Sequence, residues 1–224
     1  RESGGVAQRF IDGTQPSLEA QLCNLADAIA YNAHDVDDGV RSGLITMAQL
    51  RDAVPLFARY YEATLADWPQ LLVPDAQRKL LYESIRRMLS EQVYDVIHSS
   101  RARLESAKVD SVQDVRLHGQ VLIVFSDEMK AESQRLKQFL FKQLYRHPQV
   151  MQTMDGAQQV VRELFTAYMV EPERMKPRFV QRVREASTLN DRARVVADFI
   201  AGMTDRYAAR EHEQITGLSL LGVP

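Results

Sequence analysis

The stretch that decides the fold is PSLEAQLCNLADAIAYNAHDVDDGVRSG, residues 16–43. Its apolar side chains recur every three or four residues, which is the period of one face of an α-helix. The members of this stripe are Leu18, Leu22, Leu25, Ile29, Val36 and Val40. Pro16 and Ser17 are typical of a helix start, and Gly43 is well placed as a C-terminal stop. The pattern therefore predicts one long amphipathic helix over residues 17–42.

The same helical period continues through most of the remaining chain. Thr46 and Gln49 have the spacing of a capping box, which predicts a short helix that ends near Pro55. Further helices are expected at 56–68, from Pro74 to beyond Leu104, and at 127–146, 155–170, 173–186 and 189–213. We therefore predict an all-α fold, in which residues 213–224 form a tail that is loose or docked on a neighbour.

One segment departs from the helical period. Residues 121–125, VLIVF, are apolar and mostly β-branched, as in a β-strand. A single strand finds no partner in this chain with which to form a stable sheet. We therefore interpret the segment as a buried extended connection or as the lead-in to a helix.

The composition is that of an ordinary soluble globular chain, with 45% hydrophobic and 26% charged residues among 224. The net charge of -2 gives no electrostatic reason to expect nucleic acid or an anionic membrane as the main partner. No stretch approaches the ~20 apolar residues that span a bilayer. The single cysteine, Cys23, cannot form an internal disulfide. These features predict a cytoplasmic protein without a membrane partner.

The polar side of the helix at 17–42 carries an unusual set of residues. Asp27, Tyr31, His34, Asp35 and Asp38 fall within roughly a quarter-turn of the helix, opposite the apolar stripe. Carboxylates and imidazoles are ordinary ligands of divalent metal ions, so a metal would satisfy this arrangement. A solvated acidic face is the alternative, and the spacing alone does not decide between the two.

The residues of this helix resemble a known family. The stretches are LADAIAYNAHDVDDG at 25–39, flanked by PSLEAQ at 16–21 and RSGLI at 41–45, and DFIAGMTDRYA at 198–208. Together they resemble the bacterial deoxyguanosinetriphosphate triphosphohydrolase-like (dGTPase-like) branch of the HD-domain phosphohydrolases. Both blocks stand in the order expected for that family, so the resemblance covers nearly the whole chain. It implies a multi-helix, HD-domain-like bundle fragment followed by a C-terminal helical region.

The resemblance also implies a reaction and roles for particular residues. The family converts a deoxynucleoside triphosphate and water into a deoxynucleoside and triphosphate, with a divalent metal ion such as Mg or Mn. Its metal is held by a histidine, a later His-Asp pair and a still later aspartate, and Asp27 matches that last ligand. The family pattern Asp-x-x-x-Tyr-x-x-x-Asp is met by Asp27, Tyr31 and Asp35. Tyr31 and Asp35 are thereby implied to contact the sugar or the triphosphate. Relatives of this kind form homo-oligomers.

The sequence departs from the family pattern at its start. The first histidine and the His-Asp pair would precede Arg1, and His34-Asp35 belongs in the resemblance to the substrate-facing helix. We therefore expect only the C-terminal part of such a protein. Residues 1–54 would be the end of the HD-type catalytic core and 55–224 a C-terminal helical domain. A chain with one of the metal ligands is expected neither to retain the metal nor to turn over nucleotide.

A basic cluster on the long helix after Pro74 offers a further substrate contact. Its members are Arg78, Lys79, Arg86 and Arg87, and Arg86 is the residue that we select as a triphosphate-binding side chain. A solvated basic helix face is the alternative reading of this cluster.

Two kinds of function remain in view. The first is part of a metal-dependent deoxynucleoside triphosphate triphosphohydrolase, whose partner is the nucleotide and not a nucleic acid. The second is a non-catalytic nucleotide-binding or oligomerisation module, in which the acidic helix meets a partner in place of a metal. An upstream histidine and His-Asp pair would distinguish the enzyme from the module.

Overall fold

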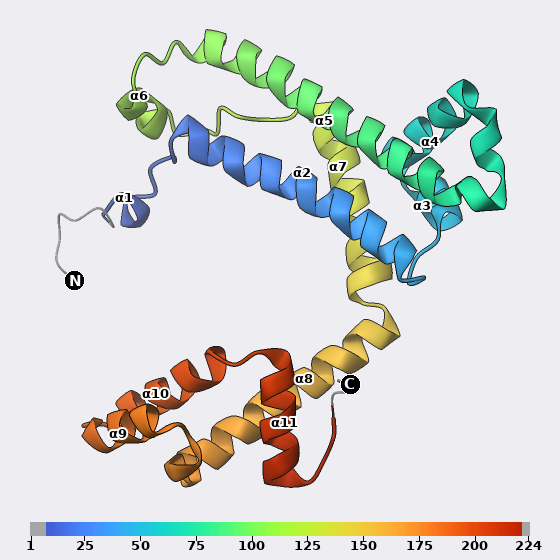
Figure 1. Ribbon diagram of the computed structural model, residues 1–224. Coiled ribbons are helices and arrows are strands. Elements are labelled where there is room, and N and C mark those ends of the chain that lie inside the picture. Colours follow the sequence, from blue (N-terminus) through green and yellow to red (C-terminus); the bar gives the residue numbers. More distant parts are fainter. Residues whose placement is uncertain (1–7, 221–224) are drawn as a thin grey trace. The chain divides into compact units, whose positions relative to one another are not determined.

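The computed structural model describes residues 8–220 of the chain (Figure 1). Within this range the chain forms 11 α-helices, three 3₁₀ turns and one π-helical turn, and no β-strand. The predicted all-α fold is therefore confirmed. No helix between residues 8 and 220 combines the length and the apolar character needed to cross a membrane.

The chain divides after Arg146 into two compact units. The first contains the following elements: α1 Gln8–Ile11, α2 Leu18–Arg41, α3 Met47–Ala53, α4 Pro55–Asp67, the 3₁₀ turns η1 Pro69–Leu72 and η2 Pro74–Ala76, α5 Gln77–Ala107, α6 Val112–Leu117, α7 Asp127–Leu140 and the π turn η3 Phe141–Tyr145. Helix α4 packs on α5, and α2 packs against both α5 and α7. The predicted boundary at residues 54/55 concerns a catalytic core and stays a prediction.

Helix α2 lies where residues 16–43 predicted it. The side chain of Ser17 accepts from the backbone N–H of Ala20, and Gly43 takes a left-handed φ of 75° just beyond the last turn. The apolar stripe is buried in its C-terminal half, where Val36 is fully buried. At the other end the stripe is not buried within residues 8–220, because the side chain of Leu22 is 49% exposed.

The extended segment at residues 121–125 is confirmed as a connection, and buried side chains take the place of a partner strand. The Oε1 atom of Gln21 accepts from the backbone N–H groups of Leu122 and Ile123, at 2.7 and 3.1 Å. The hydroxyl of Ser100 accepts from the N–H of Val124 at 3.0 Å. Backbone groups that are buried without a partner are costly, and these two side chains remove that cost without a sheet.

The second unit consists of α8 Pro148–Val170, the 3₁₀ turn η4 Pro172–Arg174, α9 Pro177–Glu185, α10 Leu189–Ala201 and α11 Asp205–Thr216. The single helix predicted over 189–213 is wrong, because the chain breaks at residues 202–204. Gly202 ends α10, and the hydroxyl of Thr204 caps α11 by accepting from the N–H of Tyr207. The predicted loose tail is also wrong as far as Leu220, which packs against the core of this unit. Residues 221–224 lie outside the described range.

Candidate functional site

The polar face of α2 is open to solvent, which the spacing of its residues had left undecided. The side chains of Asp27, Tyr31, His34 and Asp38 are exposed, and Asp35 is half-buried. Tyr31 is 62% exposed although it is a large aromatic residue. Core packing does not explain an exposed tyrosine among carboxylates. We therefore consider which residues of other elements face this side of α2.

A cavity of about 410 Å³ lies between α2, α7 and the end of the extended segment, and we name it the α2–α7 cavity. Helix α2 contributes Asp27 and Tyr31 to its wall, and α7 contributes Lys130 and Lys137. Tyr145, from the π turn that follows α7, completes the polar lining. The volume falls in the range of small-molecule sites, and most of the lining residues are polar.

The start of α7 is fixed by polar anchors. The hydroxyl of Ser126 accepts from the N–H of Met129 at 3.2 Å and so caps the helix. The carboxylate of Asp95, on α5, accepts from both the N–H and the hydroxyl of Ser126, at 2.8 and 2.6 Å. Lys130 and Lys137 are seven residues apart, so both lie on one face of α7, two turns apart. That face is turned to the cavity because Met129 and Leu136 bury the other side.

The charges in the α2–α7 cavity are not neutralised by partners within residues 8–220. Neither Lys130 nor Lys137 forms an ion pair with a described residue, and the carboxylate of Asp27 has no hydrogen-bond partner among them. The cavity thus holds two ammonium groups and one carboxylate that are available to a ligand. An anionic ligand that also carries a cation would satisfy both signs of charge.

Tyr145 and Asp35 link the π turn to α2. The hydroxyl of Tyr145 donates a hydrogen bond to the Oδ2 atom of Asp35. Burial, and then the hydrogen bond and the negative charge of Asp35, raise the pKa of Tyr145 to about 12. Tyr145 is therefore a protonated donor at neutral pH. The π turn at Phe141–Tyr145 sets the direction of this side chain, and single π turns are frequent at functional sites.

Arg86 does not line the α2–α7 cavity. Its guanidinium instead donates to the carboxylate of Glu83, from Nε at 2.8 Å and from a terminal nitrogen at 2.6 Å. Hydrogen bonds from Arg86 and Arg87 lower the pKa of Glu83 to about 2. Arg87 also donates to Asp67 and lies over the ring of Trp68. The proposed contact of Arg86 with a triphosphate stays a prediction, and its position gives that prediction no support.

The described residues do not by themselves fit a metal ion. Between residues 8 and 220 no three histidine, cysteine, aspartate or glutamate side chains converge into a metal-binding cluster. Asp27 lies in a cavity with two lysines, and a lone carboxylate beside two ammonium groups is a poor donor set for a divalent cation. We therefore derive no chemical step that runs through a metal.

Of the four predicted site residues, the structure brings three together. Asp27 and Tyr31 line the α2–α7 cavity, and Asp35 reaches it through Tyr145. Sequence reasoning missed Lys130, Lys137 and Tyr145. Lysines seven residues apart on an exposed helix face are common, so their spacing gave no specific signal. Tyr145 follows a stretch rich in apolar residues, so the sequence would suggest that its ring packs in the core.

The chain is similar to known proteins over most of its length. Residues 123–214 match the model of a phosphohydrolase-associated domain, which begins within the extended segment and includes α7 and the π turn. The chain is 46% identical over 215 residues to a deoxyguanosinetriphosphate triphosphohydrolase-like protein of Bordetella pertussis, a match that covers 96% of this chain and 53% of that protein. It is 44% identical to a protein of the same name from Azoarcus sp. strain BH72, over 95% of this chain and 53% of that protein. A third, from Thiobacillus denitrificans, is 40% identical over 95% of this chain and 54% of its own length. The chain thus spans about half the length of the curated relatives it matches.

Proposed function

We propose that this chain, which is similar to about half of a deoxyguanosinetriphosphate triphosphohydrolase-like protein, forms the substrate-binding side of a deoxynucleoside triphosphate triphosphohydrolase site. The observation that carries the proposal is the α2–α7 cavity. It brings Asp27 and Tyr31, from the helix that resembles the family, into the same space as Lys130 and Lys137. The reaction assigned to the site is the hydrolysis of a deoxynucleoside triphosphate to a deoxynucleoside and triphosphate.

The two lysines are assigned to the triphosphate. Neither has an ion-pair partner among residues 8–220, so neither has to break an existing interaction before it meets a phosphate. Lys130 and Lys137 lie two turns apart on α7, which suits an extended chain of phosphates better than a single group. Both lysines are exposed at the surface, so their ammonium groups can adjust to the phosphates of a bound nucleotide.

Tyr31 and Asp35 are assigned to the sugar. The hydroxyl of Tyr145 occupies the Oδ2 atom of Asp35, which leaves Oδ1 to accept from a sugar hydroxyl. Tyr145 thereby acts as a positioning residue for Asp35, because it fixes the rotation of the carboxylate. The exposed ring of Tyr31 offers a flat apolar surface one turn away on the same helix.

Asp27 is assigned as one ligand of a divalent metal ion, Mg or Mn, whose other ligands would lie outside the described residues. The roles assigned to the lysines, to Tyr31 and to Asp35 do not depend on the ion. On this proposal the 224 residues bind nucleotide but do not hydrolyse it.

Nucleotide binding is the first test. The affinity of this chain for dGTP is measured by calorimetry for the wild type, for Lys137→Gln and for Lys142→Gln. Lys142 is exposed on the π turn and does not line the cavity, so it controls for the change in net charge. Loss of one charge-assisted contact should weaken binding about tenfold in Lys137→Gln only. Equal affinities in the two variants would refute the assignment of the cavity to the triphosphate.

Hydrolysis is the second test. Release of triphosphate from dGTP, with Mn²⁺ or Mg²⁺, is compared between the 224 residues and a protein of the relatives' full length that contains them. Activity is expected only in the longer protein and should be lost in its Asp27→Ala variant. Triphosphate release by the 224 residues would show that they complete a site without further ligands, contrary to the proposal.

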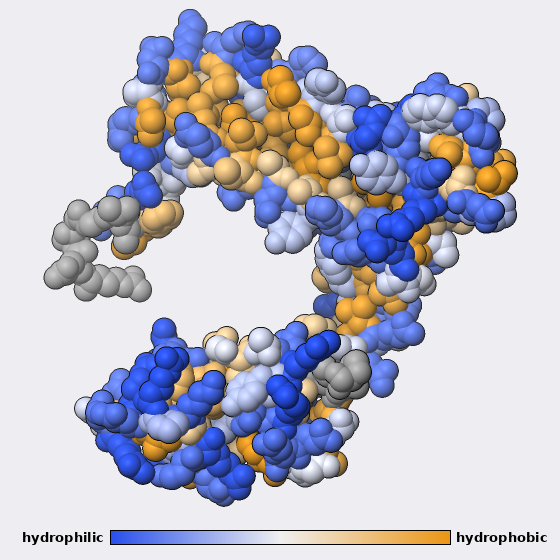
Figure 2. Space-filling view, in the orientation of Figure 1, coloured by the Kyte–Doolittle hydropathy of each residue, from blue (hydrophilic) through white to orange (hydrophobic). Residues whose placement is uncertain are grey.

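A second candidate function is a non-catalytic module that binds nucleotide or builds a homo-oligomer. Apolar residues gather on the surface of the first unit over α2 and α5 (Figure 2). Among them Leu22, Val93 and Ile97 are between 39% and 53% exposed, which favours a surface that another protein segment covers. Nucleotide binding without hydrolysis in either protein, together with an oligomeric mass by light scattering, would favour this module over the enzyme.

A further inference from the structure

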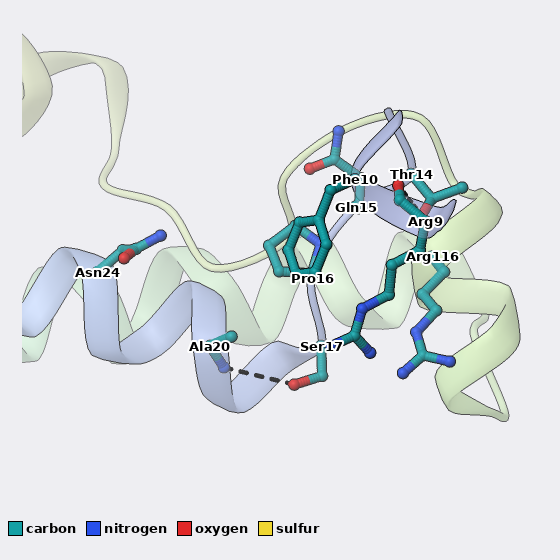
Figure 3. Close-up of a pocket in the computed structure, with 9 residues that line it drawn as sticks. All are labelled: Arg9, Phe10, Thr14, Gln15, Pro16, Ser17, Ala20, Asn24 and Arg116. Atoms are coloured by element: carbon teal, nitrogen blue, oxygen red, sulfur yellow. Dashed lines mark hydrogen bonds between the residues drawn. The ribbon is translucent and has the colours of Figure 1, made fainter. Parts of the chain in front are cut away.

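A second cavity of about 410 Å³ lies at the start of α2 (Figure 3). Its walls come from α1, from the connection that leads into α2, and from α6. Arg9 and Arg116, far apart in the sequence, both line it, and their side chains extend toward the side on which Ser17 begins α2 (Figure 3). We name it the two-arginine cavity.

Backbone contacts hold this cavity together. The N–H of Gln15 donates to the carbonyl oxygen of Arg116 at 3.0 Å, which joins the connection before α2 to α6. The side-chain amide of Gln15 reaches the carbonyl oxygen of Gly119 at 3.5 Å. Arg116 is half-buried, so its position is set by the fold and not by solvent alone. The hydrogen bonds of Gln15 thus join α6 to the connection before α2, and Arg9 and Arg116 line one cavity.

Neither guanidinium is neutralised by the described part of the chain. Within residues 8–220, Arg9 and Arg116 form no ion pair and their side chains donate no hydrogen bond to another residue. Glu19, in the first turn of α2, does not line the cavity and forms no ion pair with either arginine. Hydrogen bonds from its own backbone and from the hydroxyl of Ser17 lower the pKa of Glu19. Two like charges that line one cavity repel each other unless an anion lies between them.

We propose that the two-arginine cavity binds a phosphate-bearing ligand, with a phosphate group between Arg9 and Arg116. Two positive charges call for a ligand of charge about -2, which a phosphate supplies and a single carboxylate does not. The fork of donors on each guanidinium matches the oxygens of a phosphate. Phe10 and Pro16 add an apolar wall, and the guanidinium of Arg9 lies over the ring of Phe10, 4.9 Å from its centroid.

This inference stands apart from the function proposed for the α2–α7 cavity. Neither arginine lines that cavity, and Lys130 and Lys137 do not line the two-arginine cavity. Asn24 is the one residue among the described linings that the two cavities share. The bound phosphate can belong to an inorganic polyphosphate or to a nucleotide, and the experiment separates these sources.

The test follows the backbone amide signals of the ¹⁵N-labelled 224-residue chain during titration with inorganic triphosphate. Saturable shifts are expected at Ser17 and at the residues around Arg116. The variant Arg9→Gln/Arg116→Gln should weaken this binding at least tenfold, and Arg9→Gln alone, at an exposed position, should weaken it in the same direction. The control is Arg101→Gln/Arg210→Gln, which makes the same charge change at exposed residues outside the cavity and should leave the affinity unchanged.

Two further titrations identify the ligand. dGTP that binds more tightly than triphosphate and shifts the ring signals of Phe10 would indicate a nucleotide, whereas equal affinity without ring shifts would indicate the polyphosphate alone. Acetate at the same concentration should cause no saturable shift at Ser17. Binding of triphosphate that is unchanged in the double arginine variant, or acetate binding of equal strength, would overturn the proposal.

Discussion

Core packing and helix propensity predict opposite effects of Gly39→Ala on the free energy of unfolding. Gly39 is buried in α2, and a Cβ at this position would lie 2.8 Å from Cδ1 and 2.9 Å from Cγ1 of Ile45. It would also lie 3.3 Å from Cδ1 of Leu144. Ile45 is 1% exposed and Leu144 is 8% exposed, so neither side chain has open space into which it can move.

The magnitude follows from two opposing effects. Alanine in place of glycine inside a helix stabilises by about 1 kcal/mol. Overpacking of a well-filled core costs about 1–3 kcal/mol. We therefore expect Gly39→Ala to destabilise the first unit by about 1 kcal/mol, whereas propensity alone would stabilise it by the same amount.

Trp68 makes the assay specific. It is the one tryptophan of the sequence and follows α4, so its fluorescence during urea unfolding reports on the first unit. Gly202→Ala, in the second unit, controls for that specificity: a Cβ there meets its nearest atoms at 3.5 and 3.6 Å, which is ordinary contact, and the Trp68 midpoint should not change. A Gly39→Ala midpoint above that of the wild type would refute the packing argument.

A double-mutant cycle identifies the clash. Ile45→Val removes Cδ1, the atom closest to the added methyl, and should by itself cost about 0.5–1.5 kcal/mol. In the double variant with Gly39→Ala the loss should be smaller than the sum by about 0.5 kcal/mol or more, because the two changes share one contact. If the two losses of stability are strictly additive, the cost of Gly39→Ala does not come from its contact with Cδ1 of Ile45.

Three further predictions concern other parts of the molecule. The pKa of Glu83 is about 2 in the folded chain, below its ordinary value of 4.5. Between these two pH values the unfolded chain therefore binds more protons than the folded chain. The stabilisation from Glu83 is lost as the pH falls through this window. Glu83→Gln should therefore lower stability at pH 7, by about 1 kcal/mol after allowance for the exposure of Arg86, and flatten the acid side of a urea-midpoint profile. His212 is 1% exposed and contacts Glu163 through Nε2 at 2.6 Å, so His212→Leu should cost about 2–4 kcal/mol and raise amide hydrogen exchange in α8 and α11. Leu136→Ala, at a fully buried position of α7, should cost about 2–5 kcal/mol in the Trp68 urea assay, and a loss below 1 kcal/mol would contradict its place in the core.

The sequence predicted the elements whose signals are local. The capping box at Thr46 and Gln49 is present with both of its hydrogen bonds, and α2 begins and ends within one residue of its predicted bounds. The break at residues 202–204 was missed because apolar residues continue the helical period across it. Thr204 followed by Asp205 is an N-cap signal, and it outweighed the periodicity.

The site was predictable only on the helix that carries the family motif. Asp27 and Tyr31 could be selected because they match the Asp-x-x-x-Tyr-x-x-x-Asp pattern of the family that the sequence resembles, whereas their shared helix face alone left their role open. Lys130 and Lys137 are candidate ligand-binding residues because they lie opposite α2 in the cavity. That position depends on contacts between residues that are far apart in the sequence. No pattern within α7 contains that information.

The partners that position α7 are polar, and for that reason they also escape an argument from hydrophobic period. Gln21 is 3% exposed and holds the extended segment that leads to α7, and Asp95 holds the first turn of the helix through Ser126. Gln21 and Asp95 each accept hydrogen bonds from backbone N–H groups at buried or half-buried positions. Removal of either side chain would leave a backbone N–H without a partner. A change at Gln21 would therefore act on the α2–α7 cavity from outside its lining. On the proposed function, a substitution of Gln21 or Asp95 should weaken nucleotide binding although neither side chain lines the cavity.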